Sequence, residues 1–188
     1  MIDVALFQVR QILDQYLSRK LDLDNGTVIL NGLSNADPAQ SERNRNKIIV
    51  TMVNLEYETN KQFYGGQRHD GGQISYNNPA VNFNIDILIS ANFDDYVEAL
   101  KRLTLVIEFF QANLTLDSEQ YPHWPAGLHA LKFEIENSPF SKTHNLWTAL
   151  GVSYLPSIIY KIRHVTVQSG QIKATSAAIQ DVSGAARQ

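Results

Sequence analysis

The residues with the clearest chemical potential stand together in the segment GGQRHDGG, positions 65–72, where Arg68, His69 and Asp70 lie between two pairs of glycines. These residue types serve as acids, bases and metal ligands, so the segment is a candidate catalytic or metal-binding constellation. Adjacent residues rarely converge on one atom, however, and no second His stands at metal-ligand spacing. The glycines favour a flexible surface loop that orders on contact with a partner, so we expect a docking loop here.

Other titratable residues give weaker signals of chemistry. The remaining histidines are scattered along the chain: His123, His129, His144 and His164. No Gly-x-Ser-x-Gly, phosphate-loop or His-Glu-x-x-His pattern accompanies them. Glu134 and Glu136 stand two apart on an expected strand and share one face, as paired carboxylates of a hydrolase do, but solvated strand charges are the commoner explanation. We assign no catalytic residue, no cofactor and no metal ligand.

The segment LWTALGVSYLPSIIYKIRHVTV, from Leu146 to Val167, is the most informative stretch of the chain. Gly151 suits the end of a short helix because Gly adopts positive φ at low cost, and Pro156 suits the start of a strand. The residues expected to be mostly buried near the helix end are Trp147, Leu150 and Tyr154. We interpret Trp147, Leu155 and Pro156 first as residues that pack helix against strand, and second as candidate contacts.

The strand in this segment ends with basic and aromatic residues. Tyr160, Lys161 and Arg163 lie on it, and Lys173 follows. Such an ending is a candidate nucleic-acid contact, but phosphate binding usually takes about 6–10 contacts. With 16 basic and 19 acidic residues the chain has a net charge of −3, so no general attraction to nucleic acid or anionic membrane exists. We expect no nucleic-acid partner.

Size and composition fit one folded domain without covalent staples. A domain of 188 residues buries roughly 70 % of its unfolded surface, which is enough for a hydrophobic core. The absence of Cys excludes disulfides, a thiolate nucleophile and a Cys-based zinc site. No apolar run reaches the ~18 residues of a membrane span, and Asp3 stands where a signal peptide is basic. We expect a soluble protein made in the cytoplasm.

Hydrophobic periodicity divides the first half of the chain into elements. Apolar residues at helical spacing predict an amphipathic helix over Ile2–Leu17. Thr27–Leu30 is a candidate short strand, and the polar stretch 31–46 is expected to be an exposed loop. The apolar run Lys47–Glu58 predicts a strand that is covered on both faces. Val81–Ser90 alternates instead, which predicts one core face and one polar face.

The second half continues this alternation. Asn92 is expected to cap a helix over 94–113 that lies against the sheet. The apolar stripe of this helix comprises Leu100, Leu103, Ile107 and Phe110. Segment Thr115–Gly127 holds two prolines around Trp124 and is expected to be an ordered loop. Leu131–Ile135 alternates with charged residues and predicts another strand.

The C-terminal part completes the predicted fold. Ser141 or Thr143 is expected to cap the helix that ends near Gly151, and the last long strand, 158–167, is expected to return through Gly170 into a strand at Ile172. Residues 169–188 are rich in small residues and are expected to form an extended or partner-ordered tail. The order of elements predicts a single α+β domain with a mixed or antiparallel sheet and helices packed on one face.

The segment 146–167 closely resembles the end of the tail-terminator or cap proteins of contractile injection systems, the phage-tail-like particles of the antifeeding-prophage and virulence-cassette type. Three further segments match this family: MVNLEYETN at 52–60, NPAVNFNIDILISANF at 78–93 and FDDYVEALKRLTLVIEFFQAN at 93–113. The combination of ANF, FFQAN and LG-x-x-YLPS is specific, and the resemblance spans almost everything from the first helix to Val167. It implies a phage tail-terminator-like domain over residues 1–168, followed by the tail 169–188.

The same resemblance implies a non-enzymatic structural subunit that closes the end of a tube. It implies a ring, hexameric to match tube and sheath, on the end distal to the baseplate, with the inner tube protein and the sheath protein as partners. The particle is released from the cell or held at its envelope. Tyr160, Lys161 and Arg163 would then contact neighbouring subunits or the last ring of the tube. A different class stays open: a small hydrolase or carbohydrate-binding module that uses Arg68, His69 and Asp70 with the Trp124 loop.

Overall fold

The computed structural model describes residues 1–33, 38–59, 67–70, 73–77, 80–167 and 172–177. In chain order the elements are α1 (Ile2–Leu21), β1 (Val28–Leu30), α2 (Pro38–Asn44), β2 (Lys47–Tyr57), β3 (Gln67–Asp70), β4 (Gln73–Asn77), β5 (Val81–Asn92), α3 (Tyr96–Ala112), β6 (Thr115–Leu116), β7 (Leu131–Ile135), α4 (Phe140–Leu150), β8 (Ser157–Val167) and β9 (Ile172–Ala177). They build a six-stranded sheet in the order β1-β2-β5-β8-β7-β6 and a three-stranded sheet in the order β3-β4-β9.

The six-stranded sheet is mixed. β1 runs parallel to β2, and the other described strand pairs in this sheet are antiparallel. The long strands β2, β5 and β8 form its centre, with Val50 opposite Ile89 and Leu88 opposite Ile159. Branched apolar residues pack well on a pleated surface, which explains why this run forms the middle of the sheet. The predicted α+β class with a mixed sheet is confirmed.

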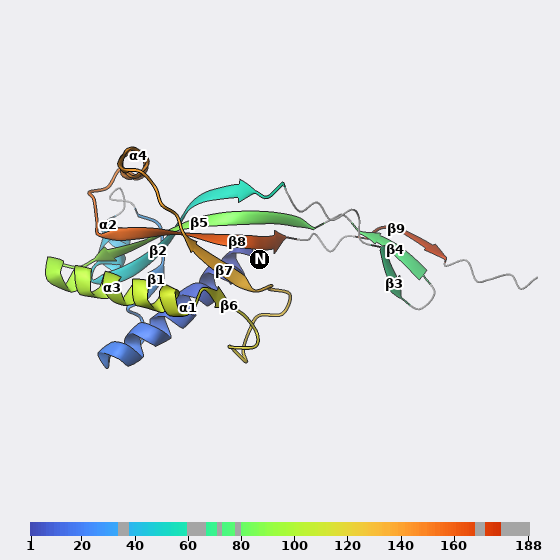
Figure 1. The fold of residues 1–188 in the computed structure, drawn as a ribbon, viewed down its shortest axis with the longest axis horizontal. Coiled ribbons are helices and arrows are strands. Elements are labelled where there is room, and N and C mark those ends of the chain that lie inside the picture. Colours follow the sequence, from blue (N-terminus) through green and yellow to red (C-terminus); the bar gives the residue numbers. More distant parts are fainter. Residues whose placement is uncertain (34–37, 60–66, 71–72, 78–79, 168–171, 178–188) are drawn as a thin grey trace, which may run out of the picture.

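Helices α1 and α3 lie side by side on one face of this sheet (Figure 1). The predicted first helix is confirmed and continues to Leu21, where Asp22 adopts a left-handed conformation with φ of 52°. The apolar residues that α1 buries recur at helical spacing: Ala5, Leu6, Val9, Ile12, Leu13 and Leu17. They join Ile48, Val50 and Ile87 of the sheet in the main hydrophobic core.

Helix α3 begins at a different cap from the predicted one. The carboxylate of Asp95 accepts hydrogen bonds from the N–H groups of Val97 and Glu98, so Asp95 is the N-cap. Asn92, the predicted cap, is the last residue of β5 and its Nδ2 donates to the carbonyl of Asn44 at 2.9 Å. The prediction of Asn92 as the cap is therefore wrong, because its side chain is engaged by the end of α2.

The buried face of α3 is also turned relative to the predicted stripe. Phe109 and Phe110 are buried together with Ala99 and Val106, whereas Leu100 and Ile107 are exposed. Phe109 and Phe110 are large enough to fill the space above the sheet, and the Phe110 ring lies 4.8 Å from the Phe133 ring. The rotation therefore leaves apolar side chains of α3 open to solvent, which matters for the surfaces described below.

The opposite face of the sheet carries the short helix α4. Its Trp147 is buried in a second cluster with Leu33, Ile49 and Leu88. Ile49 and Leu88 alternate along their strands with residues of the main core, so this cluster lies on the other side of the sheet. The expectation that helices pack on one face is thus met by α1 and α3 and not by α4. The α4 N-cap is Pro139, without the predicted Ser or Thr side-chain cap.

The faces of β5 and β2 agree with the predicted patterns to different extents. β5 has the predicted core face and polar face, and Asn82, Asn84 and Asp86 on its polar face are buried. Their cover comes from polar side chains on neighbouring strands, which sequence periodicity cannot reveal. β2 was predicted to be covered on both faces, and this holds only for its first half. From Met52 onward, apolar side chains such as those of Met52 and Leu55 are exposed.

The stretch 31–46 was predicted to be an exposed loop, but residues 38–44 form helix α2. Pro38 stands at its first position, where a missing N–H costs nothing. Asn44 ends the helix and is buried. Its Oδ1 accepts a hydrogen bond from Asn31 Nδ2 at 2.8 Å, and its Nδ2 donates to the Gly32 carbonyl at 3.1 Å. Residues 34–37 lie outside the described residues.

The three-stranded sheet β3-β4-β9 projects beyond the ends of β5 and β8, away from the helices (Figure 1). We call it the arm. The predicted docking loop at 65–72 contains β3 and ends just before β4, so Arg68, His69 and Asp70 lie on a strand rather than in a loop. β9 contains the predicted strand at Ile172 and pairs with β4, which ties the first part of the predicted tail to the arm. Residues 178–188 lie outside the described residues.

Candidate assembly surfaces

A lysine surrounded by carboxylates marks the centre of the polar sheet face, the side opposite α1 and α3. Lys161 Nζ on β8 lies 2.9 Å from Glu56 Oε2, 3.7 Å from Asp86 Oδ1 and 3.7 Å from Glu136 Oε2. Its side chain is only 13 % exposed. The hydrogen bond to Glu56 is the main reason that the pKa of Lys161 is raised above its ordinary value, with the nearby carboxylates adding to the effect.

Neutral side chains extend this polar network along the sheet. Asn54 Nδ2 donates to Asp86 Oδ2 at 3.1 Å, and Thr166 Oγ1 donates to Asn82 Oδ1 at 2.8 Å. Asn84 Nδ2 donates to a carboxylate oxygen of Glu58 at 2.9 Å. These contacts satisfy polar groups that would otherwise be costly to bury. Each contact also forms in only one register of the strands that it joins.

Arg163 forms the second ion pair of this face. Its Nε and Nη2 both contact Glu134 Oε2, at 2.9 and 2.8 Å. The hydrogen bond to Glu134 raises the pKa of Arg163. At the next residue, His164, φ is 59° and the pairing of β5 with β8 shifts register between Phe83 and Ile85. This irregularity is a β-bulge, and it keeps both Arg163 and Thr166 on the polar face.

An apolar groove of about 700 Å³ opens at the other side of the sheet, between the C-terminal half of α3 and β7. We call it the α3–β7 groove. It is lined by Ile107, Phe110, Gln111, Leu114, Phe133, Glu134, Ile135 and Tyr160. Leu114 and Ile135 are 63 % and 61 % exposed, which is unusual for large aliphatic side chains that lie so close together. Within the chain as described, no helix or strand covers them.

Tyr160 closes the bottom of this groove. Its ring lies 4.4 Å from the ring of Phe110, and the residue is 2 % exposed. Burial raises the pKa of its hydroxyl to about 12. Tyr160 therefore belongs to the core face, whereas Lys161 belongs to the opposite polar face. Tyr160 thus does not share a surface with Lys161 and Arg163, and the side chain of Lys173 lies outside the described part of the chain.

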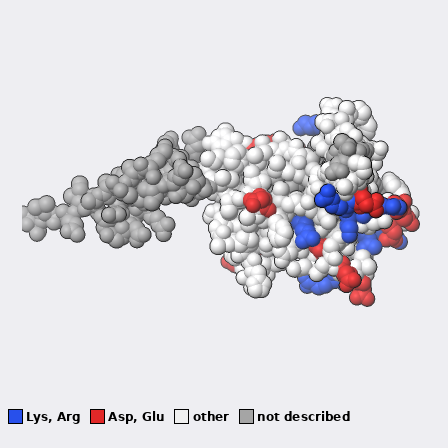
Figure 2. Space-filling view, turned by 180° about the vertical axis from the view of Figure 1, so that it is seen from behind, with Lys and Arg blue, Asp and Glu red and all other residues white. Residues whose placement is uncertain are grey.

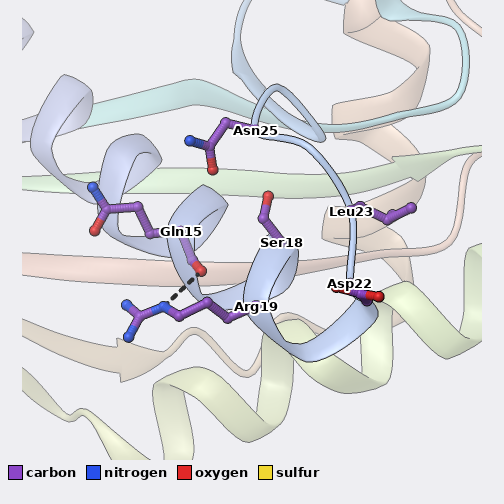
Figure 3. Close-up of a pocket in the computed structure, with 6 residues that line it drawn as sticks. All are labelled: Gln15, Ser18, Arg19, Asp22, Leu23 and Asn25. Carbon is purple, nitrogen blue, oxygen red and sulfur yellow. Dashed lines mark hydrogen bonds between the residues drawn. The ribbon is translucent and has the colours of Figure 1, made fainter.

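A second hollow, of about 490 Å³, lies at the end of α1 (Figure 3). Its residues are Gln15, Ser18, Arg19, Asp22, Leu23 and Asn25. Arg19 Nε donates to the Gln15 carbonyl at 3.1 Å and Ser18 Oγ to the Asp24 carbonyl at 3.3 Å. The side chains thus close the helix end, and they offer no paired nucleophile and base.

The other predicted contact residues have different surroundings. Trp147 is buried as expected, and Pro156 is buried while its carbonyl accepts from the Ala91 N–H at 2.9 Å. Leu155 is half-buried against the second cluster. Tyr154, predicted to be mostly buried, is 64 % exposed, although its ring lies 5.4 Å from that of Trp147. Of these residues, Tyr154 is the one presented to solvent.

The described residues include only part of the candidates for an enzymatic or carbohydrate site. The side chains of Arg68, His69 and Asp70 lie outside the described part of the chain. Trp124 is half-buried and its Nε1 donates to the Leu128 carbonyl at 2.8 Å, so its loop is ordered as predicted and its ring packs on the core. Where side chains are described, no three His, Asp or Glu residues group to hold a metal ion. Glu134 and Glu136 are engaged by Arg163 and Lys161.

Sequence reasoning missed the α3–β7 groove. Ile107 was expected to lie in the apolar stripe that packs on the sheet, and Ile135 was recognised only as an apolar position of a strand. The sequence feature that could have indicated this groove is Leu114, an apolar residue that follows the C-cap of α3. Charged side chains also distribute unevenly: Figure 2 shows them gathered at the end of the body where α1 ends and α3 begins, away from the arm.

Two solved structures share the fold of this chain. The chain matches a sheath/tube terminator of an extracellular contractile injection system, PVC, in its extended state, with a TM-score of 0.64 and 15 % identity over 100 % of this chain and 64 % of that chain. It matches the tube-terminating cap of the anti-feeding prophage with a TM-score of 0.56 and 12 % identity over 92 % of this chain and 59 % of that one. The likeness at this identity is one of fold, and the chain spans about three fifths of the length of these proteins.

The family follows from the sequence itself. The family model described as the Pvc16 N-terminal domain matches residues 8–181. The chain therefore belongs to the Pvc16 N-terminal domain family, and its predicted resemblance to the terminators of contractile injection systems is confirmed. No curated protein sequence matches it significantly. Among the described helices, none combines the length and hydrophobicity that crossing a membrane requires.

Proposed function

We propose that this chain is a structural subunit of a terminator that caps the tube and sheath of a contractile injection system at the end distal to the baseplate. The observation that carries the proposal is family membership over residues 8–181, together with a fold that matches a sheath/tube terminator over 100 % of the chain. The proposed work is non-enzymatic and is done by complementary surfaces. The protein is made in the cytoplasm and becomes part of the particle.

The proposed assembly is a ring of six copies. A growing tube exposes the same interface after each added ring, so a ring that matches this interface below and differs above stops growth. Ring closure requires a head-to-tail interface, in which two different surfaces of the chain meet. The polar sheet face, the α3–β7 groove and the arm supply chemically different surfaces of this kind.

The partners in this proposal are further copies of the chain, the inner tube protein and the sheath protein. Candidate contacts are Arg68, His69 and Asp70 of the arm, Tyr154 and Leu155 beside α4, and Lys161 and Arg163 on the polar sheet face. Trp147, Pro156 and Tyr160 are buried, so we assign them to holding these surfaces in place. Residues 1–168 form the terminator domain in this proposal, and 169–188 are the segment that partners order.

Deletion of the gene for this subunit, followed by electron microscopy of the particles, tests the proposal. Without a terminator, tubes and sheaths should vary widely in length, and expression of the wild-type chain should restore one length. Uniform sheathed particles in the deletion strain would reject the terminator role. Native mass measurement of the purified protein gives the number of copies in the ring, because the mass of the assembly increases by one chain mass with each copy.

A further inference from the structure

The two edges of the six-stranded sheet differ in their protection. Edge strand β1 is closed by α1: Asp14 Oδ1 accepts from the Val28 N–H at 2.8 Å, and Arg10 Nε donates to the Val28 carbonyl at 2.9 Å. At the opposite edge, β6 pairs only with Leu131 and Lys132 of β7. Ile135 therefore lies beyond the last pairing strand among the described residues.

The backbone of β7 points hydrogen-bonding groups outward at this edge. The Phe133 N–H donates to the Leu114 carbonyl at 2.9 Å, away from β8, whereas the Glu136 N–H donates to the Ile159 carbonyl of β8 at 3.0 Å. Amide directions alternate along a strand, so Ile135 shares the outward direction of Phe133. An edge of this kind is a template for an added strand.

The α3–β7 groove runs beside this edge and defines the chemistry of such a strand. Exposed Leu114 and Ile135 require apolar cover. Glu134 lines the groove while it pairs with Arg163, and the exposed Glu108 follows the groove residue Ile107 on α3. A segment that combines small or branched apolar residues with a basic residue would therefore fit both the groove and its border.

The arm of the same chain has this composition. Segments 59–79 and 168–177 contain three basic residues and one acidic residue, whereas 1–58 and 80–167 contain 12 basic and 17 acidic residues. By sequence, the segments that contain the arm therefore carry a net charge of +2, and segments 1–58 and 80–167 together carry −5, with His neutral. β9 has the sequence IKATSA, with Ile172 next to Lys173, and it stands at the edge of the arm with one side unpaired by the strands of that sheet.

The backbone of the arm extends away from the body. Among the element contacts of the described residues, β4 contacts β3 and β9, and Figure 1 places all three strands beyond the ends of β5 and β8. The segments that contain the arm and the rest of the chain carry net charges of opposite sign, so the two attract each other.

We propose that β9 of one copy adds to the free edge of β7 in the next copy, with Ile172 and its small neighbours over the α3–β7 groove and Lys173 at its acidic border. This inference rests on the proposed ring, because it names the two surfaces that meet at each head-to-tail contact. Repetition of one such contact around an axis leaves no arm and no groove uncovered.

Cysteine cross-linking tests this contact, because the chain contains no Cys. The variants are Ile135→Cys on β7 and Thr175→Cys on β9, in the full chain and in purified particles treated with a short bismaleimide. The double variant should give a ladder of cross-linked copies up to the whole ring on immunoblots. Mixed particles from co-expressed single variants should give dimers, which proves contact between chains. The matched control pairs Thr175→Cys with Leu23→Cys, exposed at the far end of α1, and should give none.

Several results would overturn the contact. Particles that show the cap in electron images but give only monomer bands would refute it while leaving the terminator role intact. Particles of normal length after deletion of the gene would instead refute the proposed function. Charge reversal gives a second measurement: Lys173→Glu should lower the fraction of assembled rings several-fold, and added Glu108→Lys should restore it. Failure of this rescue in folded protein counts against the proposed docking.

Discussion

Lys161 on β8 donates a hydrogen bond to Glu56 on β2 at 2.9 Å, across the intervening strand β5 and over 105 residues of sequence. Asp86 of β5 lies beneath this bridge, 3.7 Å from the same ammonium group. One lysine therefore joins three neighbouring strands of the sheet. Because Glu136, just after β7, adds a third carboxylate, removal of the lysine affects the whole polar face.

Lys161→Met should lower the free energy of unfolding by about 2 kcal/mol, since it leaves three carboxylates close together without their cation. The partial exposure of Glu56 lets solvent screen part of the repulsion and keeps the loss below that of a fully buried pair. Lys132→Met, at an exposed position of β7, is the matched control and should change stability by less than about 0.5 kcal/mol. Equal effects of the two substitutions in urea unfolding would show that the cluster contributes nothing specific.

Tyr160 should make the protein sensitive to alkali. Its hydroxyl pKa is raised to about 12 by burial, so between about pH 10 and 12 the unfolded chain releases this proton while the folded chain retains it. Unfolding then releases a proton, and stability falls as pH rises through this window. The loss that Tyr160 causes should reach about 2 kcal/mol at its upper end.

Tyr160→Phe should remove this part of the alkaline loss, as urea midpoints at pH 9 and pH 11.5 would show. Tyr154→Phe, which removes a tyrosine hydroxyl from an exposed ring, is the matched control. If wild type and Tyr160→Phe lose the same stability between these two pH values, the hydroxyl is not held protonated by the fold.

Trp147 anchors α4 on the face of the sheet opposite α1 and α3. Trp147→Ala should lower the unfolding free energy by about 3–5 kcal/mol, because it opens a cavity among Leu33, Ile49 and Leu88. Trp147→Phe should cost clearly less, since it keeps a ring and removes an indole N–H that has no hydrogen-bond partner among the described atoms. Thermal unfolding of the two variants measures this order, and a reversed order would contradict the described packing.

Local patterns predicted much of the fold because they act over short distances. The alternation in Leu131–Ile135 predicted β7 with the bounds it has, and helical spacing predicted α1. The positive φ of Gly151, at 65°, follows from the same local logic. Helix α2 escaped prediction because seven residues show little periodicity, and its stability rests on Asn44 contacts with Asn31 and Gly32.

The surfaces were harder to predict because they depend on residues far apart in sequence. Periodicity identified Asn82 and Asn84 as facing away from the core, but their burial depends on partners such as Thr166, 84 residues later. Likewise, an apolar residue looks the same in a sequence whether a neighbour covers it or not. Ile135 was therefore recognised only as an apolar position of a strand until the short length of β6 was known.

Asp14 explains why one edge of the sheet is closed, and its removal should have two separate effects. Its carboxylate accepts from the Gly26 and Val28 N–H groups, both at 2.8 Å. Asp14→Ala leaves these donors unsatisfied and should lower the unfolding free energy by about 2–4 kcal/mol. Asp24→Ala, in the exposed turn nearby, should have little effect.

Asp14→Ala should also free the outer edge of β1 for pairing, because exposed strand edges recruit other strands. We therefore expect Asp14→Ala to form irregular aggregates at concentrations where wild type remains dispersed, as light scattering would measure. A variant that loses stability yet scatters no more light than Asp24→Ala would show that α1 itself, and not the Asp14 carboxylate, protects this edge.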